Sequence, residues 1–219
     1  MYTLQKRDIR GYRQERVPHT FFRQQDQTTH LALVLPGAGI NCQHPTLYYP
    51  TREVLTRGAD ALQIDYGLRP TFSEFAQEEI MACVAADTLA ASQAMWGERQ
   101  YEQVTLIGKS LGTLAMGYLL GAIPPQLQVQ AIWLTPLLAI PELGRQIQAR
   151  LPRSLFIIGT EDPWYDADKL SELVQLTQGE SLVIPGAEHL LEVPEGTNAS
   201  LQVMERVVRA IQAFFDQKR

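Results

Sequence analysis

The chain has 219 residues, of which 45% are hydrophobic and 20% are charged, and its formal net charge is −5. This length is enough for one large α/β domain with a sizeable core, so we expect residues 1–219 to form a single domain. The negative charge disfavours nonspecific binding to nucleic acid or to an anionic membrane surface, and we expect neither partner.

The first residues and the cysteines indicate a compartment. The segment 1–8 lacks the apolar run of a signal peptide, and no apolar stretch is long enough to span a bilayer, so no membrane insertion is expected. Cys42 and Cys83 form neither a disulfide framework nor a metal-like pair. We therefore expect a cytoplasmic protein with reduced thiols.

Strands and helices alternate along the chain. Val17 and the Phe21-Phe22 pair indicate an antiparallel hairpin at the edge of a sheet. Short apolar runs predict buried strands at 31–35, 61–65, 104–107, 131–134, 154–158 and 181–184. Apolar spacing and punctuating Pro and Gly predict helices at about 45–57, 72–96, 113–120, 141–151, 166–176 and 201–215. Thr71 and Glu74 have capping-box spacing at the start of the second helix. This order favours a mostly parallel central sheet with helices on both faces.

The segment 104–112 joins a predicted strand to a Gly-x-Ser-x-Gly motif, and a helical run follows. A serine in a sharp strand-to-helix turn needs small neighbours two places away on each side, because helix and strand approach closely there. Gly108 and Gly112 meet this need, so the Ser110 hydroxyl should stand clear of the sheet edge. The amide of Leu111 would then point to where an oxyanion forms. A glycine-rich turn with a capping serine is the alternative.

Loops at the carboxyl ends of the predicted strands carry the other notable polar residues. In an open α/β sheet the ligand site lies beyond these ends. A weak nucleophile such as Ser110 needs a base, and the base needs an orienting carboxylate. His189 and Asp162 occupy suitable loops, in the chain order serine, aspartate, histidine. Asp162 could instead cap the following helix, and Glu161 or Asp166 could be the acid.

Three of these loops resemble those of a known superfamily. Gly-Lys-Ser-Leu-Gly, which ends at Gly112, resembles the nucleophile loop of α/β hydrolases. Gly-Thr-Glu-Asp, which ends at Asp162, resembles their acid loop, and Gly-Ala-Glu-His, which ends at His189, resembles their histidine loop. The resemblance extends from about Leu31 to the end of the chain. It implies an α/β-hydrolase fold in which Ser110 is the nucleophile, His189 is the general base and then acid, and Asp162 orients His189.

The oxyanion loop of that superfamily is matched by the segment 35–38, Leu-Pro-Gly-Ala. Pro36 stands where the superfamily usually has a histidine. Carried over by position, the amides of Ala38 and Leu111 would form the oxyanion hole.

The segment 135–153 is the place where the superfamily carries any lid, and it has room for one helix only. The chain is therefore similar to small uncapped esterases and thioesterases. This similarity implies a serine hydrolase that cleaves a carboxylic ester or thioester of a small acyl substrate through an acyl-enzyme, with no metal and no organic cofactor. We expect Trp164, Tyr66 and Leu137 to line a shallow substrate groove.

Two other motifs fit the sequence less well. Gly-Lys-Ser at 108–110 imitates the end of a P-loop, but Gln103 stands where that motif needs glycine. Gly-Ala-Gly at 37–39, followed by Asp65, imitates a dinucleotide fingerprint, but Cys42 replaces its third glycine. A nicotinamide-dependent oxidoreductase is therefore a less favoured alternative, beside a hydrolase-fold protein that binds a ligand or partner without turnover.

Four residues near these motifs are expected to have ordinary structural roles. Lys109 is expected to be solvated, and Cys83 to belong to the core. Cys42 is expected to be a packed thiol, and His44 to start a helix rather than contact substrate.

Overall fold

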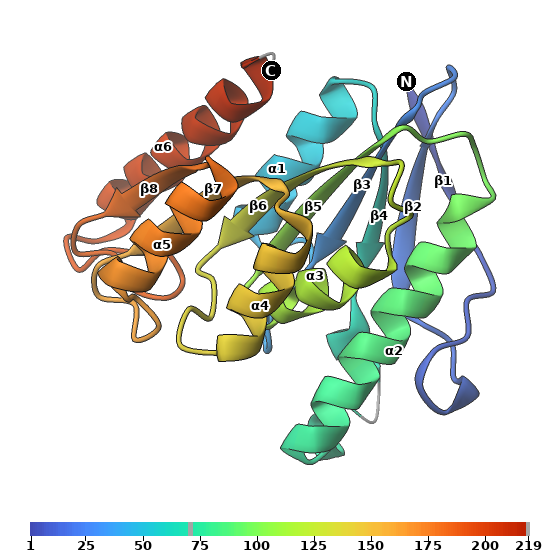
Figure 1. Ribbon diagram of the computed structural model, residues 1–219, viewed down its shortest axis with the longest axis horizontal. Helices are drawn as coiled ribbons and strands as arrows, with labels where there is room; N and C mark the ends of the chain where they lie inside the picture. The colour runs from blue at the N-terminus through green and yellow to red at the C-terminus, as the bar shows by residue number, and fades with distance from the viewer. Residues whose placement is uncertain (70–71, 218–219) are drawn as a thin grey trace.

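Within the described residues, eight strands form one sheet. Figure 1 shows this sheet at the centre of the molecule. The computed structural model describes residues 1–69 and 72–217. The strands are β1 (Tyr2–Gln5), β2 (His19–Gln24), β3 (His30–Leu35), β4 (Asp60–Ile64), β5 (Gln103–Lys109), β6 (Gln128–Leu134), β7 (Arg153–Gly159) and β8 (Glu180–Ile184). They lie in the order β1-β2-β4-β3-β5-β6-β7-β8. The strands from β3 to β8 pair in parallel, whereas the pairs β1–β2 and β2–β4 are antiparallel.

Helices cover both faces of this sheet (Figure 1). They are α1 (Pro45–Thr56), α2 (Gln77–Trp96), α3 (Leu111–Ala122), α4 (Pro141–Arg150), α5 (Ala167–Thr177) and α6 (Thr197–Asp216). Short 3-10 helices lie at Tyr12–Gln14, Tyr66–Leu68 and Phe72–Glu74. Helices α2 to α5 pack on one face around residues such as Met116 and Ile147, and α1 and α6 pack on the other around Leu47 and Phe214. None of the helices in the described ranges has the length and apolarity needed to cross a membrane.

The apolar runs found in the sequence form the interior of the sheet. Residues 31–35, for example, are fully buried, because parallel strands covered on both faces have no side exposed to water. The expected α/β architecture is therefore confirmed. The hairpin expected in the first 30 residues is present as β1 and β2, and it extends the sheet beyond β4.

Helix α2 starts later than the sequence predicts. The capping-box spacing of Thr71 and Glu74 placed its start near Phe72, but α2 begins at Gln77. Residue Thr71 lies outside the described residues, and Phe72–Glu74 form a 3-10 turn. The start is determined farther along, where the amide of Ala76 donates to Glu79 Oε2 at 3.3 Å.

A single helix, α4, occupies the segment between β6 and β7. Pro141 stands in its first turn, where a missing amide hydrogen is tolerated. Leu143 and Ile147 bury one side of α4, which packs against α3 and α5. The helix thus belongs to the layer that covers one face of the sheet, and the expected absence of a lid domain in this segment is confirmed.

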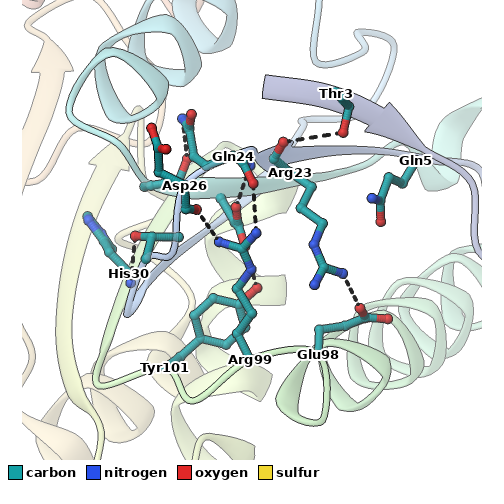
Figure 2. Close-up of polar contacts among 12 residues, drawn as sticks. Thr3, Gln5, Arg23, Gln24, Asp26, His30, Glu98, Arg99 and Tyr101 are labelled. Atoms are coloured by element: carbon teal, nitrogen blue, oxygen red, sulfur yellow. Dashed lines mark hydrogen bonds and ion pairs between the residues drawn. The ribbon is translucent and has the colours of Figure 1, made fainter. Parts of the chain in front are cut away.

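A buried polar network fastens the N-terminal hairpin to the edge of the sheet where the parallel strands begin (Figure 2). Asp60 is fully buried and accepts hydrogen bonds from the Gln24 amide and the Tyr101 hydroxyl, both at 2.7 Å. Arg99 Nε lies 3.4 Å from the same carboxylate, and the other guanidinium nitrogens donate to the carbonyls of Gln24 and Asp26. The charge of Asp60 is therefore matched by groups from two separate segments, the end of β2 and the stretch 99–101 before β5.

Removal of this carboxylate should destabilise the protein strongly. Asp60→Ala leaves the Tyr101 hydroxyl and the Gln24 amide without their acceptor and removes the carboxylate that balances the Arg99 charge, so we expect the free energy of unfolding to fall by about 3 kcal/mol. The matched control is Asp8→Ala, because Asp8 is 60% exposed and forms only surface ion pairs; it should cost about 0.5 kcal/mol or less. Urea unfolding followed by circular dichroism measures both, and equal losses would contradict the role given to Asp60.

Candidate active site

Ser110 is the single residue between strand β5 and helix α3. It has φ 52° and ψ −118°, a conformation that a non-glycine residue rarely adopts. Its amide donates to the carbonyl of Leu134 at 3.0 Å, which ties the turn to the neighbouring strand β6. The side chain is half-buried at the end of the sheet. The strand-to-helix turn predicted from the motif is therefore present.

Glycines make this turn possible by allowing backbone to approach backbone. A Cβ on Gly108 would lie 2.7 Å from the carbonyl oxygen of Gly112, and a Cβ on Gly112 would overlap the carbonyl of Leu35 in β3. A Cβ on Gly37 would lie 3.1 Å from the Cβ of Ser110. Helix α3 can thus pack this closely only with glycine at positions 108 and 112, and Gly37 lets the loop after β3 pack tightly against Ser110.

The structure brings Ser110, His189 and Asp162 into one hydrogen-bonded chain. His189 Nε2 lies 2.8 Å from Ser110 Oγ, and His189 Nδ1 lies 2.8 Å from Asp162 Oδ2. The Asp162 side chain is fully buried, whereas that of His189 is 26% exposed. A hydroxyl, an imidazole and a carboxylate in this order have the geometry needed to activate a serine.

Asp162 is the one of the three candidate carboxylates that contacts His189. Its second oxygen, Oδ1, accepts from the amide of Trp164 at 2.9 Å, so the carboxylate is held from both sides. Glu161 is exposed, and Asp166 caps helix α5 by accepting from the Lys169 amide at 3.0 Å.

The loops after β7 and β8 pack against one another, and this contact carries His189 toward the sheet. A Cβ on Gly159 would overlap the carbonyl of Ala187, and the Glu161 amide donates to that carbonyl at 3.0 Å. The Gly186 amide donates to Thr160 Oγ1 at 2.9 Å. The acid loop and the histidine loop are therefore built as one unit.

The loop after β3 lies beside Ser110 and presents unpaired amides. Ala38 is exposed, and neither its amide nor that of Leu111 has a hydrogen-bond partner among the described residues. The Leu111 amide is free because it belongs to the first turn of α3. The Tyr66 hydroxyl donates a hydrogen bond to the carbonyl of Pro36 and so supports this loop.

None of the three residues expected to line a substrate groove lines the cleft next to the loop after β3. Tyr66 is completely buried, because its hydroxyl reaches back to Pro36 instead of facing solvent. Leu137 is only 8% exposed and belongs to the hydrophobic core. Trp164 is half-buried and packs against the core, and it does not line this cleft either.

A cleft of about 690 Å³ opens instead next to the loop after β3. It begins one residue after Ala38, and its lining includes Ile40, Asn41, His44, Leu68, Phe72 and Ile80. None of the described lining residues carries a formal charge other than a protonated His44, whose pKa is lowered by burial and by the charge of Lys109. Leu68, which follows β4, is exposed in the structure, but no sequence motif marks it, so the sequence carries no signal for this cleft.

Lys109 differs most from its expected place, because it is buried rather than solvated. Its side chain is 1% exposed, and Nζ donates to Thr135 Oγ1 at 2.9 Å and to the carbonyl of His189 at 2.7 Å. Burial lowers the pKa of the ammonium to about 8, against the opposing effect of the carboxylates of Asp162 and Glu188. The Lys109 side chain lies at the end of β5, and the loops after β6 and β8 cover it, so it does not reach solvent.

The other neighbouring residues have the structural roles expected of them. Cys42 and Cys83 are fully buried, and burial raises the pKa of both thiols. His44 directly precedes α1 as expected, but it also lines the cleft next to the loop after β3. Asp65, the acidic residue of the rival dinucleotide pattern, accepts from the Cys42 amide at 2.7 Å, so its carboxylate supports a loop of the protein itself.

Solved structures of similar shape have hydrolase descriptions. A protein of unknown function from Agrobacterium tumefaciens, a candidate α/β hydrolase, is 14% identical with a TM-score of 0.75; the match covers 99% of this chain and 97% of that one. A dienelactone hydrolase from Anabaena variabilis is 17% identical with a TM-score of 0.69, and the match covers 97% of this chain and 98% of that one. The chain has the α/β-hydrolase fold. An esterase from Pyrococcus furiosus, Pf2001, is 13% identical with a TM-score of 0.66, and the match covers 97% of this chain and 93% of that one. No protein-family model and no curated protein matches the sequence.

The α/β-hydrolase fold should not tolerate a side chain at Gly112. Gly112→Ala would push helix α3 away from the Leu35 carbonyl, and we expect the free energy of unfolding to fall by about 2 kcal/mol or more. Gly121→Ala is the matched control in the same helix, because no described atom lies within 4 Å of the added carbon. It should raise stability by about 0.5–1 kcal/mol. Thermal unfolding measures both changes, and a stable Gly112→Ala variant would disprove the close approach.

Proposed function

We propose that this protein is a serine hydrolase that cleaves carboxylic esters or thioesters through an acyl-enzyme intermediate. The observation that carries the proposal is the unbroken chain of contacts from Asp162 through His189 to Ser110, with both distances at 2.8 Å. The hydrolase descriptions of proteins with the same fold support the general class, and the contacts of these three side chains support the serine mechanism.

The first half of the reaction transfers the acyl group to Ser110. Ser110 Oγ attacks the substrate carbonyl carbon while His189 Nε2 takes the hydroxyl proton. The carbonyl oxygen becomes an oxyanion and accepts hydrogen bonds from the amides of Ala38 and Leu111, which have no partner elsewhere in the described chain. Collapse of the tetrahedral intermediate breaks the bond to the alcohol or thiol, which leaves with the proton from His189.

The second half of the reaction returns the enzyme to its starting state. Water attacks the acyl carbon as His189 takes one of its protons, and the new oxyanion occupies the same pair of amides. When this intermediate collapses, Ser110 Oγ leaves and regains the proton. Asp162 accepts from His189 Nδ1–H throughout, which keeps Nε2 free to act as the base.

The substrate we propose is a small or extended, accessible acyl compound without a strong charge. No lid domain stands between β6 and β7, so the reacting bond is approached from open solvent. The cleft next to Ala38 is lined mainly by uncharged polar and apolar residues, and it lies on the side of Ser110 where an extended part of the substrate could rest. Neutral lining favours a neutral group, because a desolvated charge there would find no partner.

Covalent labelling tests the nucleophile directly. A fluorophosphonate probe should add once to the wild-type protein, and digestion should locate the adduct on the peptide that contains Ser110, because this is the one hydroxyl among the described residues that contacts the His189 imidazole. Ser110→Ala should not react, which intact-mass analysis would detect. A protein that binds ligands without turnover would leave the probe unreacted, and equal labelling of both proteins would reject Ser110.

A second test separates Asp162 from the other two carboxylates. Asp162→Asn should keep the fold but lower kcat for a short acyl ester by about two to four orders of magnitude, because the imidazole loses its orienting charge. Glu161→Gln and Asp166→Asn are the matched controls, since one is exposed and the other keeps its capping bond; both should change kcat less than about threefold. A crippled Glu161→Gln with an active Asp162→Asn would show that the acid is wrongly assigned.

A further inference from the structure

Lys109 is a buried cation that no step of the proposed reaction uses. It directly precedes Ser110, its side chain is 1% exposed, and its acceptors are the Thr135 hydroxyl and the His189 carbonyl. No carboxylate among the described residues forms an ion pair with Nζ. An unpaired buried charge is expensive, and stability alone would favour an apolar side chain of similar size.

The two acceptors of Lys109 lie on loops from different parts of the sheet. Thr135 directly follows β6, the neighbour of β5, and it has a positive φ of 43°. His189 belongs to the loop after β8, which lies at the far edge of the sheet, beyond β6 and β7. The bond from Nζ to the His189 carbonyl, at 2.7 Å, therefore joins the residue next to Ser110 to the backbone of the histidine itself.

We propose that Lys109 is a positioning residue, whose ammonium holds the backbone of His189 so that the imidazole stays between Ser110 and Asp162. This role rests on the proposed serine-hydrolase function. Within the described part of the chain, the bond from Lys109 is the only hydrogen bond made by the main chain of His189. A charged donor makes a shorter and stronger bond than a neutral one, which suits a loop that must keep a side chain within about 0.5 Å.

Charged and titratable groups from several elements surround the ammonium. Asp162 follows β7, Glu188 and His189 follow β8, and His44 directly precedes α1. The two carboxylates favour the ammonium, but burial outweighs them and brings the pKa of Lys109 to about 8. As the pH rises through about 8, the amine remains a donor but loses its charge, and its bond to the carbonyl weakens. Turnover of the wild-type enzyme should therefore decrease above about pH 8.

Lys109→Met tests the proposal, because it keeps the length and burial of the side chain but removes the charge and the donors. We expect kcat for a short acyl ester to fall about tenfold or more while KM changes less than about threefold, since misplacement affects the reacting groups and not the substrate site. The decrease in kcat above pH 8 should disappear. Hydrogen exchange of the Glu188 and Leu191 amides should accelerate, although the Tm should stay at or above that of the wild type.

Thr135→Ala is the control for the second acceptor of Lys109. It removes the hydroxyl but leaves the bond to the His189 carbonyl, so its loss of kcat should be clearly smaller. A loss as large as that of Lys109→Met would overturn the role given to the bond with His189.

The proposed function is checked in the same series by fluorophosphonate labelling of the wild type. An unlabelled wild type would refute the hydrolase itself. A labelled wild type beside a Lys109→Met variant with unchanged kcat and unchanged hydrogen exchange would refute the positioning role alone.

Discussion

The close approach of helix α3 to strand β3 is the constraint on which the candidate site depends. Gly112 lies so near the Leu35 carbonyl that no side chain fits between them, and the chain must turn from β5 into α3 within one residue. That residue, Ser110, takes a positive φ that costs about 1–3 kcal/mol. The surrounding structure maintains this strain, because the Ser110 amide is bonded to Leu134 and α3 is buried along most of its length. The hydroxyl consequently stands at the sheet edge, within reach of His189.

Most of the fold and the three central site residues could be predicted because their signals are local. A continuous apolar run such as 31–35 indicates a strand buried on both faces wherever it occurs. The two glycines around Ser110 report a close approach that only glycine permits. The loops of Asp162 and His189 follow strands of one parallel sheet, whose carboxyl ends necessarily meet along one edge. Chain order and strand ends therefore placed the three loops at one edge, whereas the choice of Asp162 over Glu161 and Asp166 came from the resemblance of the loop motifs to those of α/β hydrolases.

The burial of individual polar side chains could not be predicted, because it depends on which distant loops meet. Lysine is almost never fully buried without a partner, so solvation was the reasonable expectation for Lys109. Its two acceptors lie 26 and 80 residues farther along the chain. Tyr66 is likewise buried by a contact with Pro36, 30 residues before it. No local pattern contains such information, and the same is true of the cleft beside Ala38, whose walls come from separate loops.

The two ends of the sheet use buried charge in different ways. Where the parallel strands begin, the carboxylate of Asp60 meets a guanidinium, a hydroxyl and an amide, so the charge is compensated and the network holds the hairpin in place. Where they end, Lys109 meets only a hydroxyl and a carbonyl, and burial lowers its pKa. Folding gains little from such a charge, since apolar replacements of buried ions are often neutral or stabilising. The buried, unpaired Lys109 and the strained Ser110 beside it therefore both lower the stability of the fold at this point. Residues that lower stability in this way are typical of functional sites.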